Sequence, residues 1–151
     1  MKRLNLGAGY DIRTGWVNSD IAELPGIDVV HDLDVAPWPW DNASVDEIRA
    51  MDVFEHVNDP LVFMNQAGRV LKPGGVLRIR SPHWRSESAY TDPTHRRFCT
   101  ERTWDYWIKG TEYNLKYGAA YCYWDVLFEK VSLELTDGGS NILIVLRRIE
   151  A

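Results

Sequence analysis

The chain has 151 residues, 45% of them hydrophobic and 26% charged, which is typical of one globular domain around one core. Its net charge of −5 argues against binding bulk nucleic acid, which requires a basic surface. No apolar run approaches the roughly 18 residues that cross a bilayer, and the start "KRLNLGAG" has no signal-peptide pattern. We therefore expect a cytoplasmic protein with no membrane partner, in which Cys99 and Cys122 are reduced thiols.

Five short apolar runs in the first half of the chain predict strands, because each ends at glycine, acidic or turn residues. These runs cover residues 3–6, 16–21, 27–33, 45–51 and 76–82. The stretch "NDPLVFMNQAGRVLKPGG" predicts one helix before the fifth strand. Asn58 or Asp59 can cap this helix, Pro60 suits its first turn, and "KPGG" ends it.

The second half of the chain contains a long polar and aromatic segment and then two β-runs. Residues 83–110 predict one short helix in "TERTWDYWIKG". "YWDVLFEKVSLEL" and "SNILIVLRRIE" flank the turn "TDGG" and predict an antiparallel hairpin. The whole pattern predicts a single α/β domain over residues 1–151, with a mostly parallel sheet and an antiparallel edge.

Ligands of such sheets bind beyond the carboxyl ends of the strands, so the residues directly after each strand are the candidates for a site. Gly7, Ala8 and Gly9 follow the first strand and would let the backbone approach a ligand closely. Asp20 follows the second strand, where a carboxylate can accept hydrogen bonds from a ribose diol. Asp32 follows the third strand and could accept a hydrogen bond from an adenine amino group.

The glycine turn "LNLGAGYDIRTGWVNSD" excludes two common nucleotide sites. A phosphate-binding loop would need GxxxxGK followed by Ser or Thr, which is absent. A dinucleotide turn would need a third glycine where Ile12 stands, and "YDIRTG" is too short for the helix that binds a pyrophosphate. An adenosine ligand without phosphate would need no such helix, and S-adenosylmethionine (SAM) is such a ligand.

The order of these motifs resembles the class I SAM-dependent methyltransferases of the small methyltransferase-domain type. The matching pieces span residues 3–82: "LNLGAG", "GWVNSDI", "HDLDVAPWPWDNASVDEI", "DVFEHVNDP" and "AGRVLKPGGVLRIRSP". The resemblance implies a Rossmann-like sheet, SAM as the cofactor and methyl transfer as the activity. The chain departs from the pattern in its reduced first helix, and in Asn5, which stands where an acidic residue is usual. It also has almost nothing before the first strand, where many relatives carry a substrate lid, so the resemblance implies that residues 83–110 are the lid or insertion on the substrate side.

The resemblance also implies the residues of the cofactor site. Gly7, Ala8 and Gly9 would line the methionine part of SAM, and Asn5 would stand near its amino group. The other residues implied are Asp20 and Ile21 at the ribose, Asp32 and Leu33 at the adenine, and Met51 and Asp52 at the methionine end.

Residues after the fourth and fifth strands are the candidates for catalysis. Methyl transfer depends mainly on holding donor and acceptor in line, but an oxygen or nitrogen acceptor can also need a base. We predict His83 or His95 as that base, with Asp92 orienting a histidine and His56 as the next candidate. Arg85, Arg96 or Arg97 could bind an anionic group of the substrate. The acceptor is expected to be a small molecule or a sugar, methylated at oxygen, nitrogen or carbon.

Three other functions are compatible with the same residues. The chain could bind SAM without methyl transfer, or be an interaction module that has lost its cofactor. It could also be a metal-dependent enzyme that uses His83, Asp92 and His95, although their spacing fits no sharp metal motif and we assign no metal ligand. The edge strand of the terminal hairpin could pair with a second copy and form a homodimer.

Overall fold

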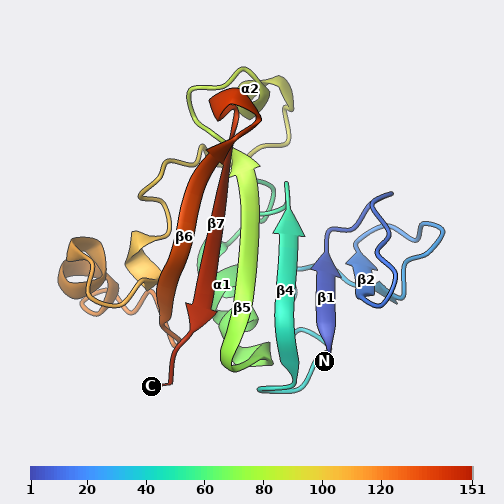
Figure 1. The fold of residues 1–151 in the computed structure, drawn as a ribbon, viewed down its shortest axis with the longest axis horizontal. Coiled ribbons are helices and arrows are strands. Elements are labelled where there is room, and N and C mark those ends of the chain that lie inside the picture. The colour runs from blue at the N-terminus through green and yellow to red at the C-terminus, as the bar shows by residue number, and fades with distance from the viewer. Residues whose placement is uncertain (151) are drawn as a thin grey trace.

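The computed structural model describes residues 1–150 and contains one seven-stranded sheet with the order β3-β2-β1-β4-β5-β7-β6 (Figure 1). Strands β1 to β5 are parallel to one another, whereas β7 is antiparallel to both β5 and β6. The predicted α/β class and the antiparallel hairpin are therefore confirmed. The strands are β1 (Arg3–Leu6), β2 (Val17–Asp20), β3 (Val29–Val30), β4 (Val45–Met51), β5 (Leu71–Pro82), β6 (Phe128–Thr136) and β7 (Asn141–Arg148).

Helix α1 (Pro60–Val70) is the only helix longer than one or two turns in the part of the chain that the structure describes. Asp59 caps it, because its Oδ1 accepts the Leu61 backbone N–H at 2.8 Å. Its apolar face packs Phe63 and Met64 against the sheet with no exposed surface. The shorter elements are α2 (Ser88–Thr91), the 3₁₀ turns η1 (Asp105–Trp107) and η3 (Asp137–Gly139), and the π turn η2 (Asn114–Gly118).

Several predicted element bounds differ from those observed. The strands at 16–21 and 27–33 are shorter, and β3 pairs only through Ser19 with Val29 and Asp20 with Val30. The predicted helix in residues 100–110 was wrong, since only the 3₁₀ turn η1 forms there. Threonine side chains compete with the helix: Thr103 Oγ1 accepts the Thr100 N–H at 2.8 Å, and the Thr111 hydroxyl donates to the Asp105 carbonyl at 2.5 Å.

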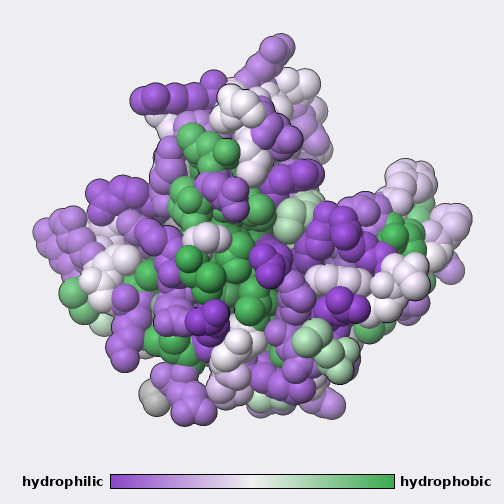
Figure 2. Space-filling view, in the orientation of Figure 1, coloured by the Kyte–Doolittle hydropathy of each residue, from purple (hydrophilic) through white to green (hydrophobic). Residues whose placement is uncertain are grey.

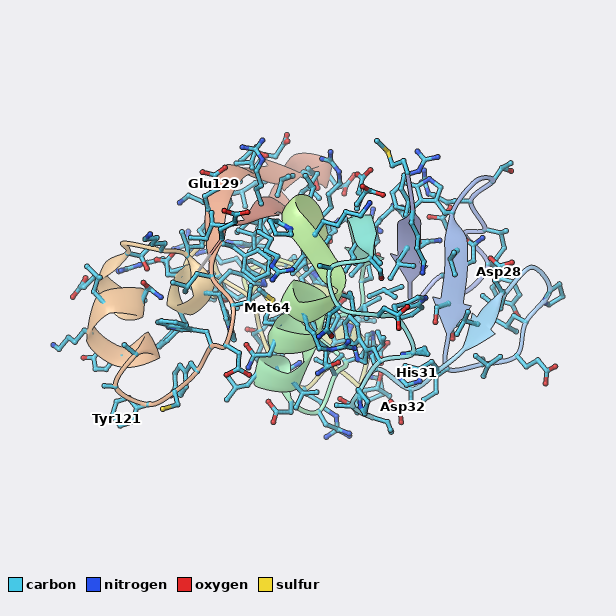
Figure 3. All side chains as sticks on the ribbon, turned by 90° about the horizontal axis from the view of Figure 1, so that it is seen from below. Asp28, His31, Asp32, Met64, Tyr121 and Glu129 are labelled. Carbon is cyan, nitrogen blue, oxygen red and sulfur yellow. The ribbon has the colours of Figure 1, made fainter. Side chains whose placement is uncertain are left out.

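Within residues 1–150 no helix lies between β1 and β2 or between β2 and β3, so the first crossover is reduced, as predicted. One face of the sheet is consequently left without a covering helix. Figure 3 looks up the strands from below and shows α1, with Met64, on one side of them. Figure 2 shows the opposite face, where an apolar strip over β5 to β7 is surrounded by hydrophilic residues.

Strand alternation explains the two faces. Along β5 and β7, Leu77, Ile79, Ile144 and Leu146 are fully buried against α1. The intervening positions, which include Arg78, point to the open face. Most buried-face residues in these strands are apolar, Ser81 being a buried polar exception, and their neighbours are often charged, which is the pattern of a sheet with one solvated face. No helix within residues 1–150 is long and apolar enough to cross a membrane.

Candidate active site

The carboxyl ends of β1 to β4 meet at a first cavity of about 360 Å³. This is where a parallel sheet normally binds its ligand, and the volume lies within the roughly 300–1,000 Å³ of small-molecule sites. The cavity is lined by residues that follow the strand ends: Gly7, Asp20, Ile21, His31, Asp32, Leu33, Asp34, Asp52, Val53, His56 and Val57.

The glycine turn after β1 is held by the end of β2. Gly9 N–H donates to Asp20 Oδ2 at 2.8 Å, and Ala8 N–H donates to the Ser19 carbonyl at 3.0 Å. Gly7 has φ +60°, and a Cβ there would lie 2.2 Å from Cγ2 of Val53. Both the positive φ and the lack of room for a Cβ atom therefore require glycine at this position.

Asp20 is the anchor of this turn and is partly available to a ligand. Its Oδ2 accepts from Gly9, and its Oδ1 accepts the Ala22 N–H at 3.0 Å. A carboxylate offers about four acceptor sites, so about two remain that can face the cavity. Ile21 beside it is 67% exposed and offers an apolar surface to a ligand at the cavity mouth.

The first cavity is acidic. Four carboxylates line it, and its lining within residues 1–150 includes no lysine or arginine. Asp32 and Asp34 also shape the loop after β3, since Asp32 accepts the Asp34 N–H at 2.9 Å and Asp34 accepts the Asn58 N–H at 2.7 Å. Such a lining favours hydroxyl groups and cations and disfavours phosphates.

Six of the ten residues predicted for the cofactor line this cavity: Gly7, Asp20, Ile21, Asp32, Leu33 and Asp52. Ala8, Gly9 and Met51 do not, although Gly9 and Ala8 hold the turn from behind. Asn5 also lies outside the lining. Its Nδ2 donates to the Asp11 carbonyl at 2.8 Å and to Asn18 Oδ1 at 3.0 Å, and its Oδ1 accepts from Arg49 at 3.0 Å.

Four lining residues were missed by the sequence reasoning: His31, Asp34, Val53 and Val57. His31 stands directly after β3, and Figure 3 shows it next to Asp32 at that end of the sheet. Its position in "HDL" was a usable signal, because it follows a strand as Asp20 does. The two valines had no signal beyond lying between β4 and α1.

A second cavity of about 490 Å³ adjoins the first, with which it shares Asp52 and His56. Asp52 directly follows β4 in the left-handed region, with φ 57°, and its carboxylate pairs with the Arg80 guanidinium. Asp tolerates this conformation better than most residues. The second cavity is lined by Asp52, Glu55, His56, Pro82, Ser86, Glu87, Ser88, Asp92, His95, Ser140 and Asn141.

Three predicted catalytic residues meet in this second cavity. The rings of His56 and His95 have centroids 4.7 Å apart, and Asp92 Oδ2 lies 4.0 Å from Nε2 of His56 and 3.9 Å from Nε2 of His95. The hydroxyl of Thr94 donates to Asp92 Oδ1 at 2.7 Å, and this hydrogen bond is the largest cause of the lowered pKa of Asp92.

The same hydrogen bonds fix which ring nitrogens are free. His95 Nδ1 lies 2.9 Å from the Ala89 carbonyl, which can only accept, so Nδ1 carries the proton. The Thr94 hydroxyl donates to Asp92 and therefore accepts from Nδ1 of His56 at 3.0 Å. In neutral His56 and His95 the basic lone pair is thus on Nε2, on the side of Asp92.

Glu55 forms the buried floor of the second cavity, with 1% of its surface exposed. Its Oε2 accepts the Ser81 hydroxyl at 2.5 Å, whereas its Oε1 is buried and has no hydrogen-bond partner. Burial raises the pKa of the Glu55 carboxyl, and the hydrogen bond from Ser81 partly opposes this shift. An unpartnered buried carboxylate oxygen is unusual and costly in a folded protein.

His83 does not join Asp92 and His95, which corrects the set predicted for a metal-dependent enzyme. Its Nδ1 accepts the Arg85 N–H at 3.3 Å, and its Nε2 lies 3.2 Å from Glu101 Oε1. Both nitrogens are therefore occupied by other contacts, and His83 does not line either cavity. Among residues 1–150 the potential metal ligands that come together are Glu55, His56 and His95.

The predicted anion-binding arginines have other contacts. Arg97 donates to the backbone carbonyls of Phe54 and Val57, the second at 2.5 Å, and its desolvation lowers its pKa. It thus ties the loop of Asp92 to the residues after β4. Arg85 lies over the Trp84 ring at 4.8 Å. Neither arginine lines the two cavities.

Sequence comparison finds a family described as "Methyltransferase domain", whose model matches residues 7–79. The chain is also 36% identical over 78 residues to a probable S-adenosylmethionine-dependent methyltransferase of Mycolicibacterium smegmatis. This alignment covers 52% of the chain but only 29% of that protein. The chain is thus much shorter than this relative.

Structural comparison finds the same sheet in many solved proteins. The 1,6-didemethyltoxoflavin-N1-methyltransferase of Burkholderia thailandensis, solved with S-adenosylhomocysteine, has a TM-score of 0.60 at 14% identity, covering 98% of this chain and 71% of that one. The cyclase SpnF has a TM-score of 0.66 at 14% identity, covering 99% of this chain and 75% of that one. At these identities the likeness concerns the fold alone.

Proposed function

We propose that the chain is a class I SAM-dependent methyltransferase, which transfers a methyl group from SAM to an oxygen or nitrogen atom of a small-molecule or sugar-type acceptor. The observation that carries the proposal is the acidic first cavity at the strand ends, with Asp20 holding the glycine turn. The acceptor would occupy the second cavity, which adjoins the first at Asp52 and His56.

The first cavity fits the chemical groups of SAM. SAM carries an ammonium and a sulfonium and no phosphate, and the cavity offers carboxylates without a lysine or arginine among its described lining residues. Asp20 has acceptor sites left for ribose hydroxyls. Asp32 lies beside Leu33 in the lining, where a carboxylate oxygen and an apolar side chain suit an adenine edge and face.

Asp52 would face the methionine end of the cofactor, because it lines both cavities. SAM supplies an activated methyl group. The protein's part is to bind donor and acceptor on either side of Asp52. The acceptor atom is then held in line with the sulfur–methyl bond that breaks. Glycine at position 7 keeps the backbone close to the donor side.

His56 and His95 would act on the acceptor. As its oxygen or nitrogen forms a bond to the methyl carbon, the sulfur–carbon bond breaks and the acceptor must lose a proton. The Nε2 lone pairs of the two imidazoles can take that proton, and Asp92 beside them stabilises the resulting charge. His95 is the stronger candidate, because only 7% of its side chain is exposed and the Ala89 carbonyl orients its ring.

The lining of the second cavity supports a small polar acceptor. Ser86, Ser88 and Asn141 offer hydrogen-bond donors and acceptors, and Glu87 adds a carboxylate. A polyanionic acceptor such as bulk RNA or DNA would meet three acidic side chains besides Asp52 there. A hydroxylated molecule, such as a sugar, fits this mixture of groups.

The test begins with calorimetry of SAM and S-adenosylhomocysteine binding to the purified chain. We expect both to bind one to one. Incubation with methyl-labelled SAM and a panel of small polyols, amines and sugar derivatives should then yield S-adenosylhomocysteine and a methylated product by mass spectrometry. Absence of SAM binding would contradict the proposal. SAM consumption to another product would favour a non-methylating SAM enzyme.

A further inference from the structure

We propose that Glu55, His56 and His95 form a binding site for a divalent transition-metal ion in the second cavity. One potential ligand atom from each residue lies within 4.8 Å of those of the other two. Ligands about 2.1 Å from a tetrahedral ion lie about 3.4 Å from one another, so small side-chain rotations would close the site. The ion would occupy the two Nε2 lone pairs, so in the metal-bound state the ion and not a free imidazole would favour loss of the acceptor's proton. This role of the ion rests on the proposed function, whereas its binding does not.

The two histidines are arranged as metal ligands usually are. A metal-binding imidazole commonly donates its other ring N–H to a carbonyl, carboxylate or hydroxyl, which orients the ring. His95 donates from Nδ1 to the Ala89 carbonyl, and His56 donates from Nδ1 to the Thr94 hydroxyl. Each Nε2 is consequently free, and both lie within 4.0 Å of the same oxygen of Asp92.

Glu55 provides an independent indication of a missing partner. The side chain is 99% buried, yet its Oε1 has no hydrogen-bond donor among residues 1–150. Its other oxygen is held by Ser81, which fixes the carboxylate in place. A cation would supply the partner that this oxygen lacks, at a position where the chain brings two imidazoles nearby.

The ligand set also indicates the kind of ion. Two imidazoles and one carboxylate suit zinc, cobalt, nickel or iron(II), whereas magnesium and calcium prefer oxygen ligands alone. Asp92, 44% exposed and held by Thr94, lies where it can become a further ligand or accept from a metal-bound water. The cavity leaves the remaining side of the ion open to an oxygen or nitrogen of the acceptor.

The experiment measures binding of zinc and cobalt by the full chain after treatment with a chelator. Calorimetry with zinc should give one site per chain, and cobalt should produce the visible absorption bands of a protein-bound, low-coordinate ion. His56→Ala, His95→Ala and Glu55→Gln should each weaken zinc binding at least about tenfold. His83→Ala is the matched control, because it removes an imidazole outside the cluster, and it should leave the affinity unchanged within about twofold.

Several results would overturn the site. The first is that the unmodified chain binds no zinc, the second is that all three ligand variants keep its zinc affinity, and the third is that His83→Ala loses as much zinc affinity as they do. Circular dichroism of each variant separates loss of a ligand from loss of the fold, and Glu55→Gln keeps the side-chain shape if an alanine variant unfolds. SAM titration of the same samples separates the two proposals. SAM binding without zinc binding overturns only the metal site, and zinc binding without SAM binding overturns only the proposed function.

Discussion

The two cavities share Asp52 and His56 but are built by different means. The first uses residues that directly follow β1 to β4, so the hydrogen-bonded strands fix their positions. The second joins residues after β4 to a loop some 37 positions later, in which Asp92 and His95 lie. A cavity at strand ends follows from the sheet, whereas the second exists only because a loop folds back onto it.

Different contacts therefore stabilise the two cavities. In the first, Asp20 joins two neighbouring strand ends through the backbone of the glycine turn. In the second, Arg97 attaches the loop by donating to a backbone carbonyl after β4, and Thr94 attaches it by a hydrogen bond to His56. We expect changes in the first cavity to alter cofactor affinity and changes in the second to alter turnover or stability. Each change should have little effect on the property that depends on the other cavity.

The largest expected effect is that of Asp20→Ala on SAM binding. The change removes acceptors for the ribose and leaves the Gly9 N–H without its partner. Hydrogen bonds to a charged group contribute about 1.5–3 kcal/mol each, so a loss of about 3 kcal/mol, or about 100-fold in Kd, is expected. Calorimetry measures it, with Asp41→Ala as the control, since Asp41 is an exposed loop residue outside both cavities. An unchanged Kd in Asp20→Ala would remove the ribose assignment.

The next effect concerns turnover in the second cavity. His95→Ala removes one of the two free Nε2 atoms and should lower kcat about 100-fold, as loss of a positioned base or ligand does. The Kd of SAM should stay within about twofold, because His95 does not line the first cavity. Single-turnover kinetics with the acceptor from the screen measures kcat, and His83→Gln serves as control. Equal losses of SAM affinity and kcat would break the distinction between the cavities.

Arg97→Ala tests what holds the second cavity together. The guanidinium donates to the carbonyls of Phe54, Val57 and Asn58, and its removal leaves these acceptors without donors. We expect a loss of about 2 kcal/mol in unfolding free energy, or roughly 4–8 °C in Tm. Thermal unfolding measures it against Arg96→Ala, because the exposed side chain of Arg96 forms no hydrogen bond or ion pair with the described residues. A Tm equal to that of Arg96→Ala would mean that other contacts hold the loop.

The same contrast explains what the sequence could predict. The order of the strands along the chain, α1 and six positions of the first cavity followed from local patterns, because a strand end is visible in the sequence and the sheet brings such ends together. Asn5 lies outside the lining of the first cavity, because alternation along β1 directs its side chain to the open face, where it forms hydrogen bonds with Asn18 and Arg49. The sequence shows that side chains alternate between the two faces of β1, but it does not show which face of the sheet lacks a covering helix.

On the acceptor side, the sequence could indicate the segment but not its pairing. His83, Asp92 and His95 were grouped because they are close in sequence, yet hydrogen bonds turn His83 toward Glu101 and bring His56 to His95 instead. Glu55 precedes His56 in sequence, and only its burial with an unpartnered oxygen distinguishes it. Contacts between loops depend on tertiary packing, which no local pattern encodes.

The smallest expected effect is a chemical one that reports how firmly the loop is attached. Cys99 lies under the second cavity's loop, and burial raises the pKa of its thiol to about 11, so only about 0.1% is thiolate at pH 8. Cys122 is exposed. We expect a thiol reagent at pH 8 to modify Cys122 within seconds and Cys99 only over hours, measured by mass spectrometry after peptide digestion. In Arg97→Ala the Cys99 rate should rise several-fold while the Cys122 rate stays constant. Fast Cys99 modification in the unmodified chain would mean that the loop opens readily, and the second cavity would then form only when its ligand binds.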